Sequence, residues 1–211
     1  MALKRRSFPR GRRVPYDQIR AELRDGDILL CAGRGVFSTM IQKATRSVWS
    51  HVGFIQRLDH VDRLMLLESV EPIGVRTVPL AKYLTDYDAR GNAYPGGMVV
   101  IRHRDFESHA TPAKLRRLTQ YAVDQFGYPY DRSQIARMAA RILASVISFN
   151  RREHERIEAN NAFICSEYVA RCYEHIKLKV KWNRKGFIAP ADFACDSKFD
   201  LVGILKRPGR G

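Results

Sequence analysis

A cysteine at the start of an amphipathic segment is the first candidate for chemistry in this sequence. Residues Phe163–Ile176 carry apolar side chains at helical spacing, which predicts a helix of about three to four turns with Cys165 in its first turn. The unpaired N–H groups and the dipole at a helix start favour the thiolate, which is the nucleophilic form of cysteine. Free cysteines are also among the most buried residues, so position alone leaves both interpretations open.

A histidine and a carboxylate far upstream are the partners that a nucleophilic cysteine needs. His51 begins one apolar segment and Glu68 lies in the next, and both segments alternate as strands do. In a hairpin symmetric about residues 59 and 60, His51 would pair with Glu68 on one face of the sheet. With Cys165 at that sheet edge, the three side chains predict a nucleophile, a base and a group that orients the base. A structural histidine and a half-exposed strand carboxylate are the alternative interpretation.

The helices and strands that must position these side chains follow one another in mixed order along the chain. This order favours an α+β fold with an antiparallel sheet. No linker divides the body, so we expect a single domain at residues 15–211 behind a disordered basic tail at 1–14. The expected strands are 28–32, 51–55, 64–70, 75–78, 98–102 and 201–205. The expected helices are 18–23, 36–45, 80–84, 112–126, 134–149, 163–176 and 190–194, and Thr111 is the expected N-cap of the fourth.

The charge of the chain is strongly basic, with 37 Lys and Arg against 22 Asp and Glu and a net charge of +15. Such a balance favours polyanionic partners, namely nucleic acid, anionic membranes or acidic cell-wall polymers. A solvated basic surface without a specific partner is the alternative. The sequence has neither zinc-finger spacing nor the aromatic signature of an RRM domain, so nucleic-acid binding is suggested by charge only.

The four cysteines are scattered and none forms a CxxC pair, so we expect neither a structural zinc site nor another metal or cofactor. Such cysteine usage fits a reducing compartment. There is no apolar run of about 18 residues, which a membrane span would need. The basic start is not followed by the apolar stretch of a secretory signal, and we therefore expect a cytoplasmic protein.

Five short motifs in one order connect these residues to a known family. The motifs are Gly26–Leu29, Ser47–Gly53, the strand around Leu67–Val70 with Gly74–Val75, Gly127–Asp131 and Ile164–Val169. With these motifs the chain resembles the circularly permuted papain-like amidases of the YaeF/YiiX type, in the NlpC/P60 superfamily of cysteine hydrolases, over roughly residues 22–205. In that family the histidine precedes the cysteine, as it does here.

The resemblance implies that Cys165 is the nucleophile, His51 the base and Glu68 the third polar residue. It also implies a small antiparallel sheet packed against the cysteine helix, and hydrolysis of an amide or ester through an acyl-enzyme. Within the motifs, Trp49, Ser50 and Tyr130 are the candidates for substrate binding.

Three functions follow as hypotheses. The first is an amidase or peptidase acting on small peptides, such as those derived from cell wall. The second uses the same three residues on a lipid acyl ester, as a hydrolase or acyltransferase docked on an anionic membrane. The third is a non-catalytic protein whose charge holds nucleic acid. The sequence gives no prediction of the oligomeric state.

Overall fold

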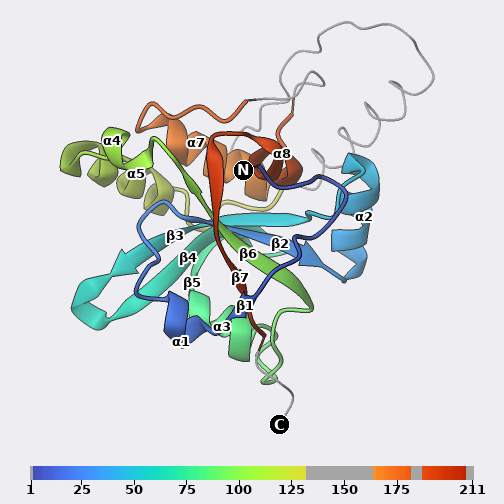
Figure 1. Ribbon diagram of the computed structural model, residues 1–211. Coiled ribbons are helices and arrows are strands. Elements are labelled where there is room, and N and C mark those ends of the chain that lie inside the picture. Colours follow the sequence, from blue (N-terminus) through green and yellow to red (C-terminus); the bar gives the residue numbers. More distant parts are fainter. Residues whose placement is uncertain (1, 132–163, 182–186, 208–211) are drawn as a thin grey trace, which may run out of the picture.

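A seven-stranded sheet runs through the centre of the molecule (Figure 1). The computed structural model describes residues 2–131, 164–181 and 187–207. All neighbouring strands are antiparallel except the first and last in sequence, which pair in parallel, so the sheet is mixed. In spatial order the strands are β1 (Arg13–Val14), β7 (Phe199–Leu205), β6 (Gly96–His103), β2 (Ile28–Gly33), β3 (His51–Leu58), β4 (Arg63–Val70) and β5 (Gly74–Pro79).

The helices lie on the two faces of this sheet (Figure 1). α7 (Cys165–Glu174) packs on one face against β3 and β4, with α5 (Pro112–Asp124) beside it. The predicted α+β fold with a sheet packed against the cysteine helix is therefore confirmed. The other described helices are α1 (Tyr16–Ile19), α2 (Val36–Thr45), α3 (Leu80–Thr85), α4 (Phe106–His109) and α8 (Pro190–Cys195), with a 3₁₀ turn η1 at Asp59–Val61.

Each face of the sheet has its own hydrophobic core, because strand side chains alternate between faces. The larger core lies under α7 and includes Val52 and Phe54 of β3 together with Tyr168 of α7. The smaller core lies under α1 and α3 and includes Ile55 of β3 and Leu66 of β4. Strand alternation places His51 on the same face as Ile55, and Glu68 on the same face as Leu66.

The register of the β3–β4 hairpin differs from the predicted one by two residues. Ile55 pairs with Leu66 rather than with Leu64, so His51 falls level with Val70 and diagonal to Glu68. The cause is the connection: η1 and the left-handed residue Asp62 make the turn asymmetric. A register shift of two residues keeps every side chain on its face of the sheet, so His51 and Glu68 still lie on the same face.

The basic segment 1–14 was expected to be a disordered tail, and the structure corrects this from residue 2 onward. The Val48 amide donates to the Arg5 carbonyl, and the Trp49 ring nitrogen donates to the Lys4 carbonyl. The Phe8 ring packs on Trp49, and β1 extends the sheet beside β7. The segment therefore lies along the body of the protein and covers the start of β3.

Most other expected elements agree with the structure within a few residues. The expected helix 36–45 coincides with α2. Thr111 caps α5 as predicted, because its side chain accepts a hydrogen bond from the Lys114 amide. The first helix lies slightly earlier than expected, at Tyr16–Ile19. The expected helix at 134–149 lies outside the described residues. Within the part of the chain that is described, every helix is too short or too polar to cross a membrane.

A left-handed glycine joins β5 to the loop after α5. Gly74 has φ +96°, and a Cβ there would lie 2.1 Å from the Tyr128 carbonyl oxygen. The Val75 amide donates to that carbonyl at 2.9 Å, and the Gly127 amide donates back to the Val75 carbonyl at 3.1 Å. Two of the sequence motifs are therefore in direct contact, and the contact holds the loop that carries Tyr130.

The first prediction concerns this contact. Gly74→Ala is expected to lower the free energy of unfolding by about 3 kcal/mol, because backbone strain and the clash with Tyr128 add. Urea denaturation measures the change. Gly91→Ala is the matched control: Gly91 also has a positive φ, but a Cβ there would meet nothing within 4 Å. Its cost should be about 1 kcal/mol, and equal losses in the two variants would contradict the clash.

Candidate active site

The nucleophile candidate lies at the first residue of α7. Cys165 follows the N-cap Ile164, whose side chain makes no capping hydrogen bond. The first helical hydrogen bond runs from the Tyr168 amide to the Ile164 carbonyl, so the amides of the first turn have no partner inside the helix. These amides and the helix dipole create a positive potential around the sulfur. The side chain is only 3% exposed.

His51 lies between Cys165 and Glu68. Its Nε2 donates to Glu68 Oε2 at 2.7 Å, and the ring is hydrogen-bonded to the Cys165 side chain as well. Cys165 comes from the helix on one face of the sheet and the other two from the opposite face, and they meet where β3 begins. The structure thus brings together the three side chains that the sequence singled out.

Glu68 is a fully buried carboxylate with three donors around it. Arg76 Nε of β5 donates to Oε1 at 3.0 Å, while His51 and the Tyr83 hydroxyl of α3 both reach Oε2. An unpaired charge at such a depth would be costly, so this full set of partners is what permits Glu68 to be there. The Tyr83 hydroxyl also lies 3.4 Å from His51 Nε2, which ties the ring and the carboxylate to the same group.

The charges of this pair follow from its partners. Burial by itself lowers the pKa of His51, but the hydrogen bonds to Cys165 and Glu68 outweigh burial and raise that pKa to about 10. Burial raises the pKa of Glu68, but the hydrogen bond and charge of His51, helped by Arg76 and Tyr83, lower it below the usual value. At neutral pH the site therefore holds an imidazolium beside a carboxylate.

A pH dependence of stability follows as the second prediction. An unfolded histidine titrates near its ordinary pKa of 6.5, whereas the folded His51 keeps its proton up to about pH 10. The stabilisation from His51 is therefore complete below about pH 6.5 and is lost as pH rises through about 10. Urea denaturation across this range should show wild-type stability falling relative to His51→Gln. A constant difference between the two proteins would contradict the raised pKa.

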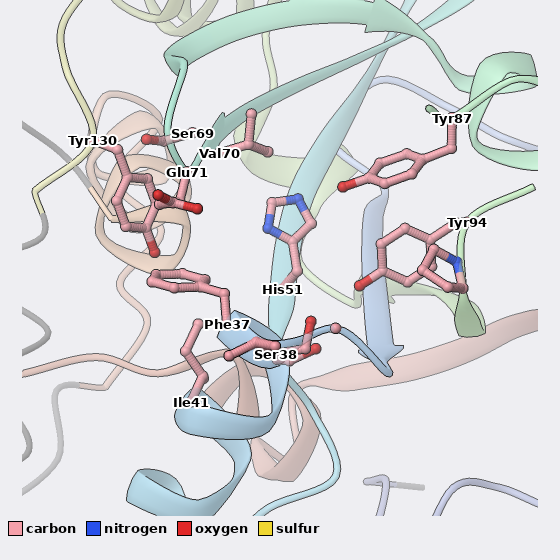
Figure 2. Close-up of a pocket in the computed structure, with 14 residues that line it drawn as sticks. Phe37, Ser38, Ile41, His51, Ser69, Val70, Glu71, Tyr87, Tyr94 and Tyr130 are labelled. Atoms are coloured by element: carbon pink, nitrogen blue, oxygen red, sulfur yellow. The ribbon is translucent and has the colours of Figure 1, made fainter. Parts of the chain in front are cut away.

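A pocket of about 220 Å³ opens beside His51. Figure 2 shows the His51 ring with Tyr87 and Tyr94 on one side and Phe37 and Tyr130 on the other. The lining is mostly aromatic and aliphatic. It consists of Gly35, Val36, Phe37, Ser38, Ile41, Ser50, His51, Ser69, Val70, Glu71, Tyr87, Tyr94, Pro95 and Tyr130.

The three substrate-binding candidates have different places. Trp49 is fully buried in the core and does not line the pocket, so the prediction for it is corrected: it supports the start of β3. Ser50 lines the pocket, and its hydroxyl accepts from the Gly33 amide at 2.9 Å. Tyr130 lines the pocket, and burial, followed by the charge of Cys165, raises the pKa of its hydroxyl.

Two residues of the site were missed from the sequence. Arg76 pairs directly with Glu68 in the β4–β5 register, which a hairpin drawn through the Pro72–Gly74 turn would have indicated. Tyr83 lies on α3, and only the packing of that helix under the sheet brings its hydroxyl to Glu68. No sequence pattern signals that second contact.

The comparison that decides the family concerns nearly the whole chain. The sequence model of the permuted papain-like amidase enzymes, YaeF/YiiX, C92 family, matches residues 22–202. The chain belongs to this family. It is therefore an enzyme of the papain-like amidase and peptidase class.

A solved structure supports the same fold. The crystal structure of metalloprotein YiiX from Escherichia coli O157:H7 matches 88% of this chain and 98% of its own chain. The TM-score is 0.57 and the sequence identity is 19%, so the likeness concerns the fold alone. Among curated proteins, none has a significantly similar sequence. The permuted order, with His51 before Cys165, is consistent with membership of the YaeF/YiiX family.

Proposed function

We propose that this YaeF/YiiX family member hydrolyses an amide bond of a small peptide through a Cys165–His51–Glu68 triad and an acyl-enzyme. The observation that carries the proposal is the chain of contacts from the Cys165 side chain to the His51 ring and on to the buried Glu68 carboxylate. The protonated His51 ring and the start of α7 both lie beside the sulfur. This supports a cysteine nucleophile with its acid–base partner in place.

The proposed reaction has two halves. In the first, Cys165 Sγ attacks the carbonyl carbon, and His51 gives its proton to the nitrogen of the leaving amine as the C–N bond breaks. In the second, His51 takes a proton from water, the hydroxide attacks the thioester, and the C–S bond breaks to release the acid and the sulfur. The backbone amide of Cys165, at the first residue of α7, is the proposed donor to the oxyanion, because the N–H groups of a first helical turn point out of the helix end.

A metal is not part of the proposed steps. YiiX is described as a metalloprotein, which raises the question for this chain. Among the described residues, no three His, Cys, Asp or Glu side chains gather as a ligand set. Both oxygens of Glu68 are already engaged by Arg76, His51 and Tyr83, so this carboxylate does not suit a metal ion.

A lipid acyl ester is the second candidate substrate, and the pocket wall supports it. Val36 and Met40 of α2 are 91% and 42% exposed, and Val36 lines the pocket. Lys43 and Arg46 follow on the same helix and beyond its end. Exposed apolar residues and basic residues on one helix suit an acyl chain in an anionic membrane. Family membership as an enzyme sets the non-catalytic hypothesis aside.

The two substrates are separated by one panel of acyl electrophiles, half of them peptide anilides and half fatty-acyl nitrophenyl esters. Released product reports turnover, and mass spectrometry of the quenched protein reports the acyl adduct. The proposal predicts turnover of anilides with an adduct on the Cys165 peptide. Turnover restricted to long acyl esters, with binding to anionic liposomes in flotation, would favour the second candidate.

The control for this panel is Cys165→Ala, which should give neither adduct nor turnover. An adduct that persists on another residue in this variant would contradict the assignment of the nucleophile. Absence of any adduct in the wild type would contradict both candidate substrates.

A further inference from the structure

The two carboxylate oxygens of Glu68 have different hydrogen-bond partners. Oε2 accepts from the His51 ring at 2.7 Å and from Tyr83, whereas Oε1 accepts from Arg76 Nε at 3.0 Å. A carboxylate held at both oxygens cannot rotate about its last bond without breaking a charge-assisted hydrogen bond. The Arg76 contact therefore determines which oxygen faces the ring.

Arg76 is placed to act on Glu68 and not on a substrate. It lies directly opposite Glu68 in the β4–β5 ladder, and it is not among the residues that line the pocket. Its side chain is 25% exposed, whereas that of Glu68 is fully buried. The guanidinium thus balances the negative charge of the buried carboxylate at Oε1, the oxygen that does not contact His51.

We propose that Arg76 is a positioning residue, which keeps Glu68 ionised and turned toward His51. This proposal rests on the proposed function, because it assigns Arg76 a part in the same triad. Without the guanidinium, burial would favour the protonated carboxyl, and an opposite charge at this range is typically worth one to three pKa units. A protonated Glu68 would no longer stabilise the imidazolium, and the ring would lose its fixed orientation.

A second buried ion pair, between Asp27 just before β2 and Arg102 of β6, provides a matched control. Asp27 is 1% exposed and accepts from the Arg102 guanidinium at 2.6 and 2.7 Å, and the Arg102 side chain is 24% exposed. Neither residue lines the pocket. Removing this arginine tests what the loss of a buried ion pair does to the fold, without touching the triad.

The experiment follows the low-field proton of His51 Nε2 by NMR during acidification, on the resting protein without substrate. The pH at which this signal is lost reports the protonation of Glu68. In Arg76→Gln the midpoint should rise by about one unit or more, because the glutamine carries no charge. Arg76→Lys should stay closer to the wild type, and Arg102→Gln should match it. Thermal unfolding of each variant shows that it remains folded over the range compared.

Kinetics give the second readout once a substrate has been found. Arg76→Gln should lower kcat by roughly tenfold with KM unchanged, since the residue lies outside the pocket. A midpoint in Arg76→Gln equal to that of the wild type, or an equal rise in Arg102→Gln, would overturn the proposal. A wild type that shows the predicted NMR shifts but cleaves no amide would contradict the proposed function and leave the role of Arg76 standing.

Discussion

Cys165→Ala is expected to abolish turnover of any substrate that the wild type cleaves, with a loss of about 10⁴-fold or more in kcat. The variant lacks the atom that forms the acyl-enzyme, while the buried position accepts the smaller side chain. Product release in the steady state measures the loss, and mass spectrometry confirms that the acyl adduct is missing.

The control for this variant is another cysteine of the same face. Cys195 of α8 is half-buried, whereas Cys31 and Cys172 are fully buried. Cys195→Ser should therefore keep wild-type turnover and thermal stability close to wild type. A similar loss of activity in the two variants would mean that cysteine replacement acts on the fold rather than on the chemistry.

His51→Gln is the second prediction with a very large effect, again about 10⁴-fold in kcat. Glutamine can hydrogen-bond to Glu68, but it cannot carry the proton between the sulfur and the leaving amine. It also removes the positive charge beside Cys165. Alkylation of Cys165 by iodoacetamide at neutral pH should slow together with turnover.

An exposed histidine serves as the comparison for this variant. His60 lies in the 3₁₀ turn at the far end of the β3–β4 hairpin. His60→Gln should change neither turnover nor the alkylation rate. Retention of most activity in His51→Gln would contradict its role as the base, whatever the behaviour of the control.

The contact between His51 and Glu68 could be predicted even though the hairpin register was not. Alternation with period two determines the face on which each side chain lies, and an even shift of register preserves it. The turn conformation determines the shift itself, and η1 with its left-handed Asp62 has no strong signature in the sequence. The sequence therefore predicts which side chains share a face of the sheet, but not which residues pair across the hairpin.

The remaining partners of Glu68 come from a neighbouring hairpin strand and from a helix packed on the sheet. Arg76 required the register of a third strand, and Tyr83 required the docking of α3 beneath the sheet. The N-terminal segment was judged by its six cations, whereas Phe8 and backbone hydrogen bonds attach it to the start of β3. Trp49 was taken for a pocket residue, but it lies before the start of β3, and its side chain is buried in the larger core against Phe8.

The four cysteines differ in the surroundings of their thiols. The thiols of Cys31 and Cys172 have pKa values raised well above the ordinary value by burial, and burial also raises that of Cys195. Cys165 alone among the four lies at the start of a helix, and the His51 ring is hydrogen-bonded to it. Solvent exposure alone would make Cys195 more reactive than Cys165, because Cys195 is the more exposed of the two. The proposed mechanism predicts the reverse order.

Competitive alkylation of the native protein with substoichiometric iodoacetamide, read peptide by peptide by mass spectrometry, tests the central claim most directly. The account predicts that Cys165 is alkylated first despite its burial, and that His51→Gln removes this preference. Alkylation of Cys195 before Cys165 in the wild type, in the order of exposure, would contradict the account.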